Sequence, residues 1–215
     1  MSVRLSKVLI LASMLLAASA SNAWTKYSIA IIDNLPLDYI YSSVAIGINK
    51  QGHVLILADT SGPSYSYQIC RGFVCSILPN PATNWTAYAL NDLDQVAGSV
   101  SIEREYAYAN GVRIGYDRAD CPSCGFGYTS FATGINNLGE VAGTAGFAGM
   151  GNHAFKYTPE VGMVSLGTLG GSSSEGRDIN MSGNIVGNAQ LSGDLETHAF
   201  LYAEGVMTDL GTLGG

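Results

Sequence analysis

Charged side chains are scarce in this sequence. Asp, Glu, Lys and Arg together make up 13% of the 215 residues, which is about half the usual share. Basic residues are the scarcer kind, with 10 Lys and Arg against 17 Asp and Glu and a formal net charge of −7. Because nucleic-acid binding requires a basic face to meet the phosphates, we expect no nucleic-acid partner. So little charge, together with 27 glycines, favours short strands and tight turns over solvated helices.

Long hydrophobic runs are also missing. The run Val8–Ala18 is too short to cross a bilayer of about 30 Å as a helix, and no later stretch approaches the roughly 18 apolar residues that a membrane helix needs. Arg4 and Lys7 precede this run and the small residues Ser21–Ala23 follow it, a pattern typical of a secretory signal peptide. We expect residues 1–23 to be removed and the rest to be secreted, periplasmic or displayed at the cell surface, with no membrane span.

One short motif occurs four times: an apolar residue, Asn, two variable residues and then a turn residue. The asparagines, at positions 49, 91, 136 and 180, are 42, 45 and 44 residues apart, a period typical of propeller and solenoid repeats. Asn at the first position and Gly at the fourth indicate a type I turn, so each copy predicts a hairpin. The copies are Ile48–Gly52, Leu90–Asp94, Ile135–Gly139 and Ile179–Gly183.

A second hairpin follows each of these turns. Phe155 and Tyr157 alternate along one segment, as do Phe200 and Tyr202 along another, and this period of two is typical of strands. Four strands of about five residues with their connections account for roughly 44 residues. We therefore predict an all-β, propeller-like array of four four-stranded units. The array is predicted as one domain, residues 24–215, with units at 44–78, 86–116, 131–166 and 175–210.

The segment 27–32 also alternates like a strand, but it has no hairpin partners before it. It occupies the place of a fourth strand, and it either completes the last sheet and closes a ring or belongs to an open array. Four units lie at the lower end of the four to eight blades of known propellers. Ring closure and an incomplete, open stack therefore both remain alternatives.

The last two units share further motifs. The tripeptide His-Ala-Phe occurs at His153–Phe155 and at His198–Phe200, and the block LGTLGG occurs at Leu166–Gly171 and at Leu210–Gly215. With the Asn-x-x-Gly turns, these motifs resemble the HAF repeats, which are named after the tripeptide. The first two units lack the tripeptide. The resemblance implies an exported bacterial protein with a propeller-like all-β array, and it carries no established reaction or binding residues.

The four cysteines form two close pairs, Cys70 with Cys75 and Cys121 with Cys124. Two such pairs are compatible with a zinc site, but an exported chain meets an oxidising compartment, where paired cysteines usually form disulfides. The repeat places the first pair around a turn between the third and fourth strands and the second pair in a connection between units. We therefore predict two local disulfides, with unpaired thiols and zinc as alternatives. Redox catalysis is not expected, because no helix is predicted at the second pair.

Two further patterns suggest metal ligands but are better explained as structure. His153 and His198 lie in adjacent units with no third ligand predicted beside them, and a zinc site requires at least three protein ligands. Asp92 and Asp94 lack the distant Glu of a calcium loop, and the other units make the same turn without these carboxylates. We expect no metal and no cofactor.

The aromatic residues divide into two groups. We expect Tyr67, Phe155, Phe200 and Tyr202, on the third strands, to form the core between units. The others lie in or near the connections between units, which gather on one face of a propeller. Exposed aromatics on one face form a surface for binding glycan or protein. The predicted binding face comprises Tyr39, Tyr41, Tyr116, Phe126, Tyr128 and Phe131.

The predicted function is binding or surface interaction without catalysis, with glycan or protein at the cell surface as the partner. One alternative is an enzyme that acts on extracellular polysaccharide, because such enzymes use paired carboxylates. Another alternative is that the chain is a fragment of a longer array. The candidate carboxylates are Glu103, Glu105, Asp117 and Asp120.

Overall fold

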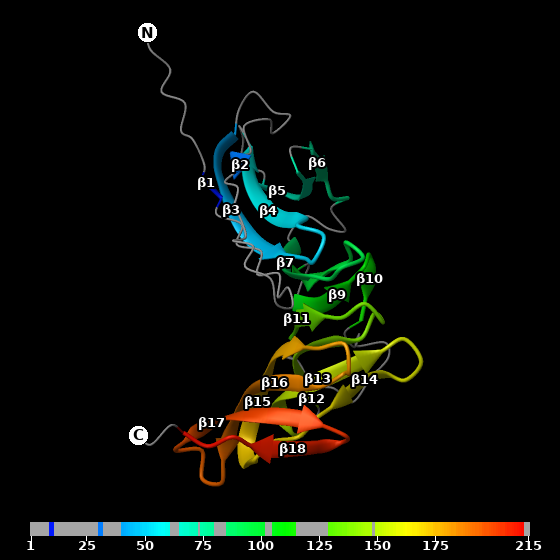
Figure 1. Ribbon diagram of the computed structural model, residues 1–215. Helices are drawn as coiled ribbons and strands as arrows, with labels where there is room; N and C mark the ends of the chain where they lie inside the picture. The colour runs from blue at the N-terminus through cyan, green and yellow to red at the C-terminus, as the bar shows by residue number, and fades with distance from the viewer. Residues whose placement is uncertain are drawn as a thin grey trace, which may run out of the picture. The chain divides into compact units, whose positions relative to one another are not determined.

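The computed structural model describes residues 9–10, 30–31, 40–60, 65–72, 74–79, 85–101, 105–114, 129–147 and 149–212 (Figure 1). These residues form strands and turns without any helix, in four four-stranded antiparallel sheets and one two-stranded sheet. The prediction of an all-β array of four four-stranded units is confirmed. The chain divides into two compact units, residues 1–79 and residues 80–215.

The first unit contains one four-stranded sheet with the strands in chain order. Its strands are β3 (Ile40–Ile48), β4 (Val54–Thr60), β5 (Tyr65–Arg71) and β6 (Val74–Ile77). The unit also contains a short pair, β1 (Leu9–Ile10) with β2 (Ala30–Ile31). Strand β2 falls within the predicted strand 27–32, and its partner in the described residues is β1 rather than the last sheet, whose four strands all come from the last repeat.

The second unit contains three sheets, each also in chain order. In Figure 1 they follow one another from green through yellow to red. The first comprises β7 (Trp85–Leu90), β8 (Val96–Ser101), β9 (Glu105–Ala109) and β10 (Val112–Arg113). The second comprises β11 (Ser130–Ile135), β12 (Val141–Phe147), β13 (Gly151–Thr158) and β14 (Gly162–Ser165). The third comprises β15 (Gly170–Ile179), β16 (Ile185–Leu191), β17 (Thr197–Ala203) and β18 (Val206–Asp209).

The core of the second unit lies between consecutive sheets. Side chains alternate between the two faces of a strand, so Phe155 and Phe200 point back to the preceding sheet while Ala154 points forward. One apolar cluster joins β7–β10 to β11–β14, and a second joins β11–β14 to β15–β18. Phe155 and Phe200 are fully buried, and Tyr202 packs at the edge of the second cluster. These three residues confirm the predicted core between units.

The repeated asparagine shapes its turn through its own side chain. In each copy the Oδ1 atom accepts hydrogen bonds from the backbone N–H groups two and four residues later; for Asn136 these bonds, from Leu138 and Glu140, measure 3.0 and 3.1 Å. The asparagine also links sheets. Asn91 Nδ2 donates to the Asn136 carbonyl at 2.9 Å, and Asn136 Nδ2 donates to the Asn180 carbonyl at 3.0 Å. The motif is therefore both a turn and an inter-sheet tie.

A repeated serine supplies a second tie between sheets. Ser130 Oγ accepts a hydrogen bond from the Ala107 N–H, and Ser174 Oγ accepts one from the Ala154 N–H, both at 2.8 Å. Each serine begins or closely follows the start of a first strand, and each alanine lies on the third strand of the preceding sheet. The bonds satisfy buried backbone donors that would otherwise destabilise the fold. Together the two ties fix how each sheet of the second unit lies on the next.

The buried phenylalanines require a glycine on the neighbouring strand. Gly143 is paired with Phe155 and Gly187 with Phe200. A Cβ atom at Gly187 would lie 2.7 Å from a ring carbon of Phe200 and would also collide with the Glu175 carbonyl oxygen. The ring can therefore lie flat over its neighbour only where that neighbour has no side chain.

We expect Gly187→Ala to lower the free energy of unfolding by about 1–3 kcal/mol, because an added methyl group overpacks the core. Urea denaturation measures this loss. Gly193→Ala is a comparison from an exposed turn where an added Cβ meets no atom within 4 Å, although its positive φ adds strain of its own. If Gly187→Ala lost no more free energy of unfolding than Gly193→Ala, the close approach of the Phe200 ring to Gly187 would be contradicted.

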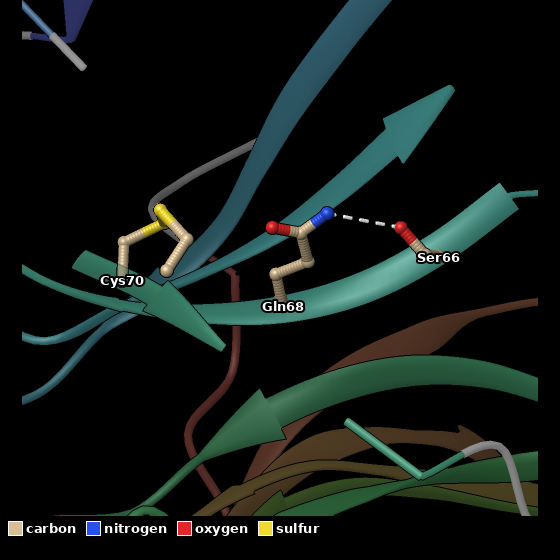
Figure 2. The surroundings of a disulfide bond; sticks show 4 residues. Ser66, Gln68 and Cys70 are labelled. Atoms are coloured by element: carbon tan, nitrogen blue, oxygen red, sulfur yellow. Dashed lines mark hydrogen bonds between the residues drawn. A yellow bond between two sulfur atoms is a disulfide. The ribbon is translucent and has the colours of Figure 1, made fainter. Parts of the chain in front are cut away.

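The sheet of the first unit has different residues at the positions of the buried phenylalanine and its glycine neighbour. Gln68 occupies the phenylalanine position, and Ile56 faces it where the other sheets have glycine. Tyr67 was predicted in this core, but the register puts Gln68 there and Tyr67 is half-buried. Gln68 is fully buried, and its Nε2 atom donates to Ser66 Oγ at 3.0 Å (Figure 2). Where the aromatic ring is replaced by Gln68, the neighbouring strand has Ile56 in place of the glycine.

Candidate binding groove

A groove of about 380 Å³ runs along the first strands of the three sheets in the second unit. Strand β11 contacts both β7 and β15, so the three first strands lie side by side. This volume falls within the range of about 300 to 1,000 Å³ that small-molecule sites occupy. The lining residues are Tyr88, Phe131, Thr133, Thr144, Asn152, Ser173, Glu175, Gly176 and Arg177.

A β-bulge in each first strand supplies one side chain to this groove. The pairing register shifts by one residue at Tyr88 in β7, at Thr133 in β11 and at Arg177 in β15. A bulge leaves its extra residue outside the ladder and redirects its side chain, often beside a functional site. The three residues occupy equivalent positions in the repeat, yet they are aromatic, hydroxyl and cationic. The scaffold therefore presents three different chemistries at one repeated position.

Two aromatic side chains give the groove its apolar surface. Tyr88 is 42% exposed, and Phe131 is half-buried on the face of β11 that looks toward the next sheet. Aromatic rings present large, rigid surfaces for contact, and a tyrosine adds a hydroxyl that bonds to a ligand or to water. These two rings can therefore stack against an apolar face of a bound molecule.

Polar groups surround the two rings. Thr133 Oγ1 donates to the Gly176 carbonyl at 2.9 Å, and Ser173 Oγ bonds to Gln190 at 2.6 Å, so both hydroxyls are held in place. The side chains of Thr144 and Asn152 make no hydrogen bond within the described residues and remain available to a ligand. The groove therefore has two hydroxyls held by internal hydrogen bonds and two polar side chains that can bond to a ligand.

The charges of the groove cancel. Among the lining residues only Glu175 and Arg177 are charged, and they form an ion pair at 2.6 Å. Exposed pairs of this kind contribute little to stability, but this one leaves the groove without net charge in an acidic chain. A neutral, polar ligand fits this surface better than an anion or a cation.

A second hollow of about 300 Å³ lies at the asparagine turns of β7–β8 and β11–β12. Two of its polar side chains, Asn137 and Gln95, already have partners. Asn137 donates from Nδ2 to Asp92 at 3.1 Å and accepts from the Asp92 N–H at 2.9 Å, and Gln95 accepts from Asn91 at 2.7 Å. This hollow therefore offers mainly apolar surface and few groups that could orient a ligand.

The structure describes only part of the predicted aromatic face. Phe131 lines the groove, but it lies within strand β11 rather than in a connection. Tyr41 lies within strand β3, but its side chain is not described. The other four residues lie outside the described ranges: Tyr39, Tyr116, Phe126 and Tyr128. Tyr88, which the sequence analysis did not select, is the second aromatic residue of the groove. Its one available signal was its position, two residues before the apolar residue of the repeated motif.

The carboxylates proposed for the alternative enzyme lie outside what the structure describes. Glu105 begins strand β9 with its side chain outside the description, and Glu103, Asp117 and Asp120 lie outside the described residues. The described part of the chain contains no group of three His, Cys, Asp or Glu residues that could hold a metal ion. It also contains no helix long and apolar enough to span a membrane.

The first predicted disulfide is present. Cys70 and Cys75 are bonded across the β5–β6 hairpin, with their Cα atoms 3.9 Å apart, and the bond appears beside Gln68 in Figure 2. The prediction of a local disulfide at this turn is confirmed. Cys121 and Cys124 lie outside the described residues, and their pairing stays a prediction.

The repeated histidines join the third and fourth strands of their sheets. His153 Nδ1 lies 2.8 Å from Ser165 Oγ, and His198 Nδ1 lies 2.9 Å from Asp209 Oδ1. Burial lowers the pKa of His153, while a backbone hydrogen bond at Met150 opposes the shift. The backbone N–H of Gly211, and then His198, lower the pKa of Asp209. The histidines act as ties within their sheets through these side-chain contacts, and His153 also hydrogen-bonds to the backbone at Met150.

Comparisons with known proteins identify no relative. No protein-family model matches the chain, and neither a curated protein nor a solved structure matches it significantly. The class of protein is therefore defined by the fold and the groove: an all-β repeat protein with a polar, aromatic groove across the first strands of its second unit.

Proposed function

We propose that this chain is an exported binding module and that the groove over β7, β11 and β15 holds a neutral carbohydrate chain. The observation that carries the proposal is the repeated bulge, which directs Tyr88, Thr133 and Arg177 into one groove from three successive sheets. An elongated ligand would contact one such residue in each sheet.

The lining of the groove fits a sugar chain. Sugar rings present an apolar face of C–H groups, which aromatic rings such as those of Tyr88 and Phe131 can cover. Their hydroxyls require both donors and acceptors, which Asn152 and Thr144 supply. The paired charges of the groove favour an uncharged polymer. No cofactor and no catalytic step enter this proposal.

Export has separate support. The N-terminal pattern resembles a signal peptide, the repeat motifs resemble HAF repeats of exported bacterial proteins, and a disulfide joins Cys70 to Cys75. Disulfides persist mainly in oxidising compartments outside the cytosol. A location at the cell surface or in the surrounding medium would also bring the groove into contact with extracellular glycans.

The test is binding of the full chain to a printed array of neutral and acidic extracellular polysaccharides. We expect binding to a neutral polysaccharide and about tenfold weaker binding for Tyr88→Ala, because one lost stacking contact corresponds to roughly 1.4 kcal/mol. Stability should be nearly unchanged, because Tyr88 is well exposed.

Tyr65→Ala is the matched control. Tyr65 is also an exposed tyrosine on a strand, but it belongs to β5 in the first unit and is not one of the residues that line the groove. Binding should survive this change. An array without neutral hits, or an equal loss of binding for the two variants, would reject the groove as a carbohydrate site and leave a protein partner as the alternative.

A further inference from the structure

The last of the three first strands brings two opposite charges into the groove. Glu175 and Arg177 lie on β15 with one residue between them, and both line the groove. The Arg177 guanidinium donates from Nη2 to Glu175 Oε2 at 2.6 Å. The side chains are 59% exposed for Arg177 and 53% exposed for Glu175, so a bound ligand can reach both of them.

The repeat does not require either charge. The register of the first strands aligns Glu175 with Thr86 of β7 and Phe131 of β11. Arg177 aligns with the two other bulge residues of the groove, an aromatic and a hydroxyl side chain. These sheets therefore form with uncharged residues at both positions, and an exposed ion pair contributes little to stability. The pair is better explained by what it does in the groove.

An arginine on its own would favour an anionic ligand. A guanidinium group has several N–H donors in a planar fork, which matches a carboxylate with two parallel hydrogen bonds. Arg177 is the only cationic side chain among the lining residues, and the bulge places it outside the strand ladder. Without the charge of Glu175, the groove would be positive and would attract a sugar chain with carboxylate groups.

We infer that Glu175 determines the specificity of the groove by occupying Arg177, so that neutral sugar chains are accepted and acidic ones are rejected. This inference rests on the proposed carbohydrate site. A carboxylate on a sugar would compete with Glu175 for the guanidinium and would lie beside a like charge, and such repulsion is a general means of rejecting a competing ligand. A neutral sugar meets no such repulsion, and the remaining N–H groups of Arg177 can donate to its hydroxyls.

The next charge along the strand does not take this role. Asp178 follows Arg177 directly, but it does not line the groove, and its Oδ1 atom accepts a hydrogen bond from the Ile179 N–H at 2.8 Å. Glu175 is the only carboxylate among the lining residues. The rejection of acidic sugars is therefore assigned to one side chain and not to the acidic character of the whole chain.

The array of neutral and acidic extracellular polysaccharides tests this assignment with the full chain. Glu175→Gln keeps the shape of the side chain and removes its charge. We expect this variant to bind polymers that carry carboxylates about tenfold more tightly than the original chain does, because one charge-assisted hydrogen bond is sufficient for that factor. The double variant Glu175→Gln/Arg177→Gln should lose this gain. Both side chains are exposed, so the fold should persist, which thermal denaturation checks.

Glu160→Gln is the control for net charge. Glu160 is an exposed turn residue of the preceding sheet and does not line the groove, so this variant loses the same negative charge at another place. It should bind acidic polymers no better than the original chain does.

The inference is overturned if the original chain binds acidic polysaccharides as tightly as neutral ones. It is also overturned if Glu175→Gln gains no more acidic binding than Glu160→Gln, or if the double variant keeps the gain. Failure of the proposed function is a different result, in which no neutral polysaccharide binds the original chain. In that case a gain for Glu175→Gln would still assign the rejection of anions to Glu175, and the absence of a gain would overturn both proposals.

Discussion

Phe200→Ala is expected to lower the free energy of unfolding by about 3–5 kcal/mol, the usual cost of truncating a fully buried phenylalanine. The ring is fully buried between the last two sheets, over Gly187. Glycine on one side and fixed strands on the other leave the cavity little freedom to collapse. Because the ring joins two sheets, the loss should appear in the cooperative unfolding of both.

Urea denaturation followed by circular dichroism measures this effect. Leu195→Ala is the control, since Leu195 lies in a turn of the same sheet with 94% of its surface exposed, and surface changes of this kind stay within about 0.5 kcal/mol. A loss below about 1 kcal/mol for Phe200→Ala would contradict its burial between the sheets.

Asn136→Ala is expected to cost about 2–4 kcal/mol, because several buried backbone groups lose their partners together. The side chain accepts hydrogen bonds from the N–H groups of Leu138 and Glu140 and donates one to the Asn180 carbonyl of the next sheet. The substitution therefore weakens both the turn and the tie between sheets.

Asn180→Ala separates these two contributions. Asn180 makes the same two turn bonds, each at 3.0 Å to the N–H groups of Ser182 and Asn184, but the described residues include no following sheet for its Nδ2 atom. We expect Asn136→Ala to cost about 2 kcal/mol more than Asn180→Ala, because Asn136 Nδ2 donates two hydrogen bonds that Asn180 lacks, one to the Asn180 carbonyl and one to Glu140 Oε2, and each contributes about 1 kcal/mol. Equal losses would show that the asparagine acts only within its turn.

Much of the fold was visible in the sequence because it depends on short-range rules. The Asn-x-x-Gly copies predicted four hairpins at a period near 44 residues, and the structure has four asparagine turns at those positions. Alternation along the third strands correctly placed Phe155 and Phe200 in the core. Both rules use local geometry, which a sequence records directly.

The errors came from features that depend on pairing between strands. Gln68 was not recognised as the counterpart of Phe155, because its partner Ile56 compensates for the missing ring only when the two strands are side by side. The inter-sheet bonds of Ser130 and Ser174 likewise involve residues about twenty positions away. No local pattern distinguishes such a serine from one in a loop.

The candidate site was the least predictable part. A bulge is a mismatch between two strands, so neither strand alone reveals that Tyr88 or Arg177 leaves the ladder. Binding residues were expected in or near the connections, where Phe131 lies close to one, whereas Tyr88 lies within a strand. The groove lies along the first strands, where the repeat brings three bulges together.

Backbone amide shift mapping of the full chain shows whether a ligand binds along the first strands of the second unit. The probe is an oligosaccharide cut from the polysaccharide that binds best on the array. We expect the amide signals of Tyr88, Thr133 and Arg177 to shift together, because the three residues line one groove on three sheets. Shifts confined to the hollow around Val112 and Leu138, with these three residues unmoved, would contradict it.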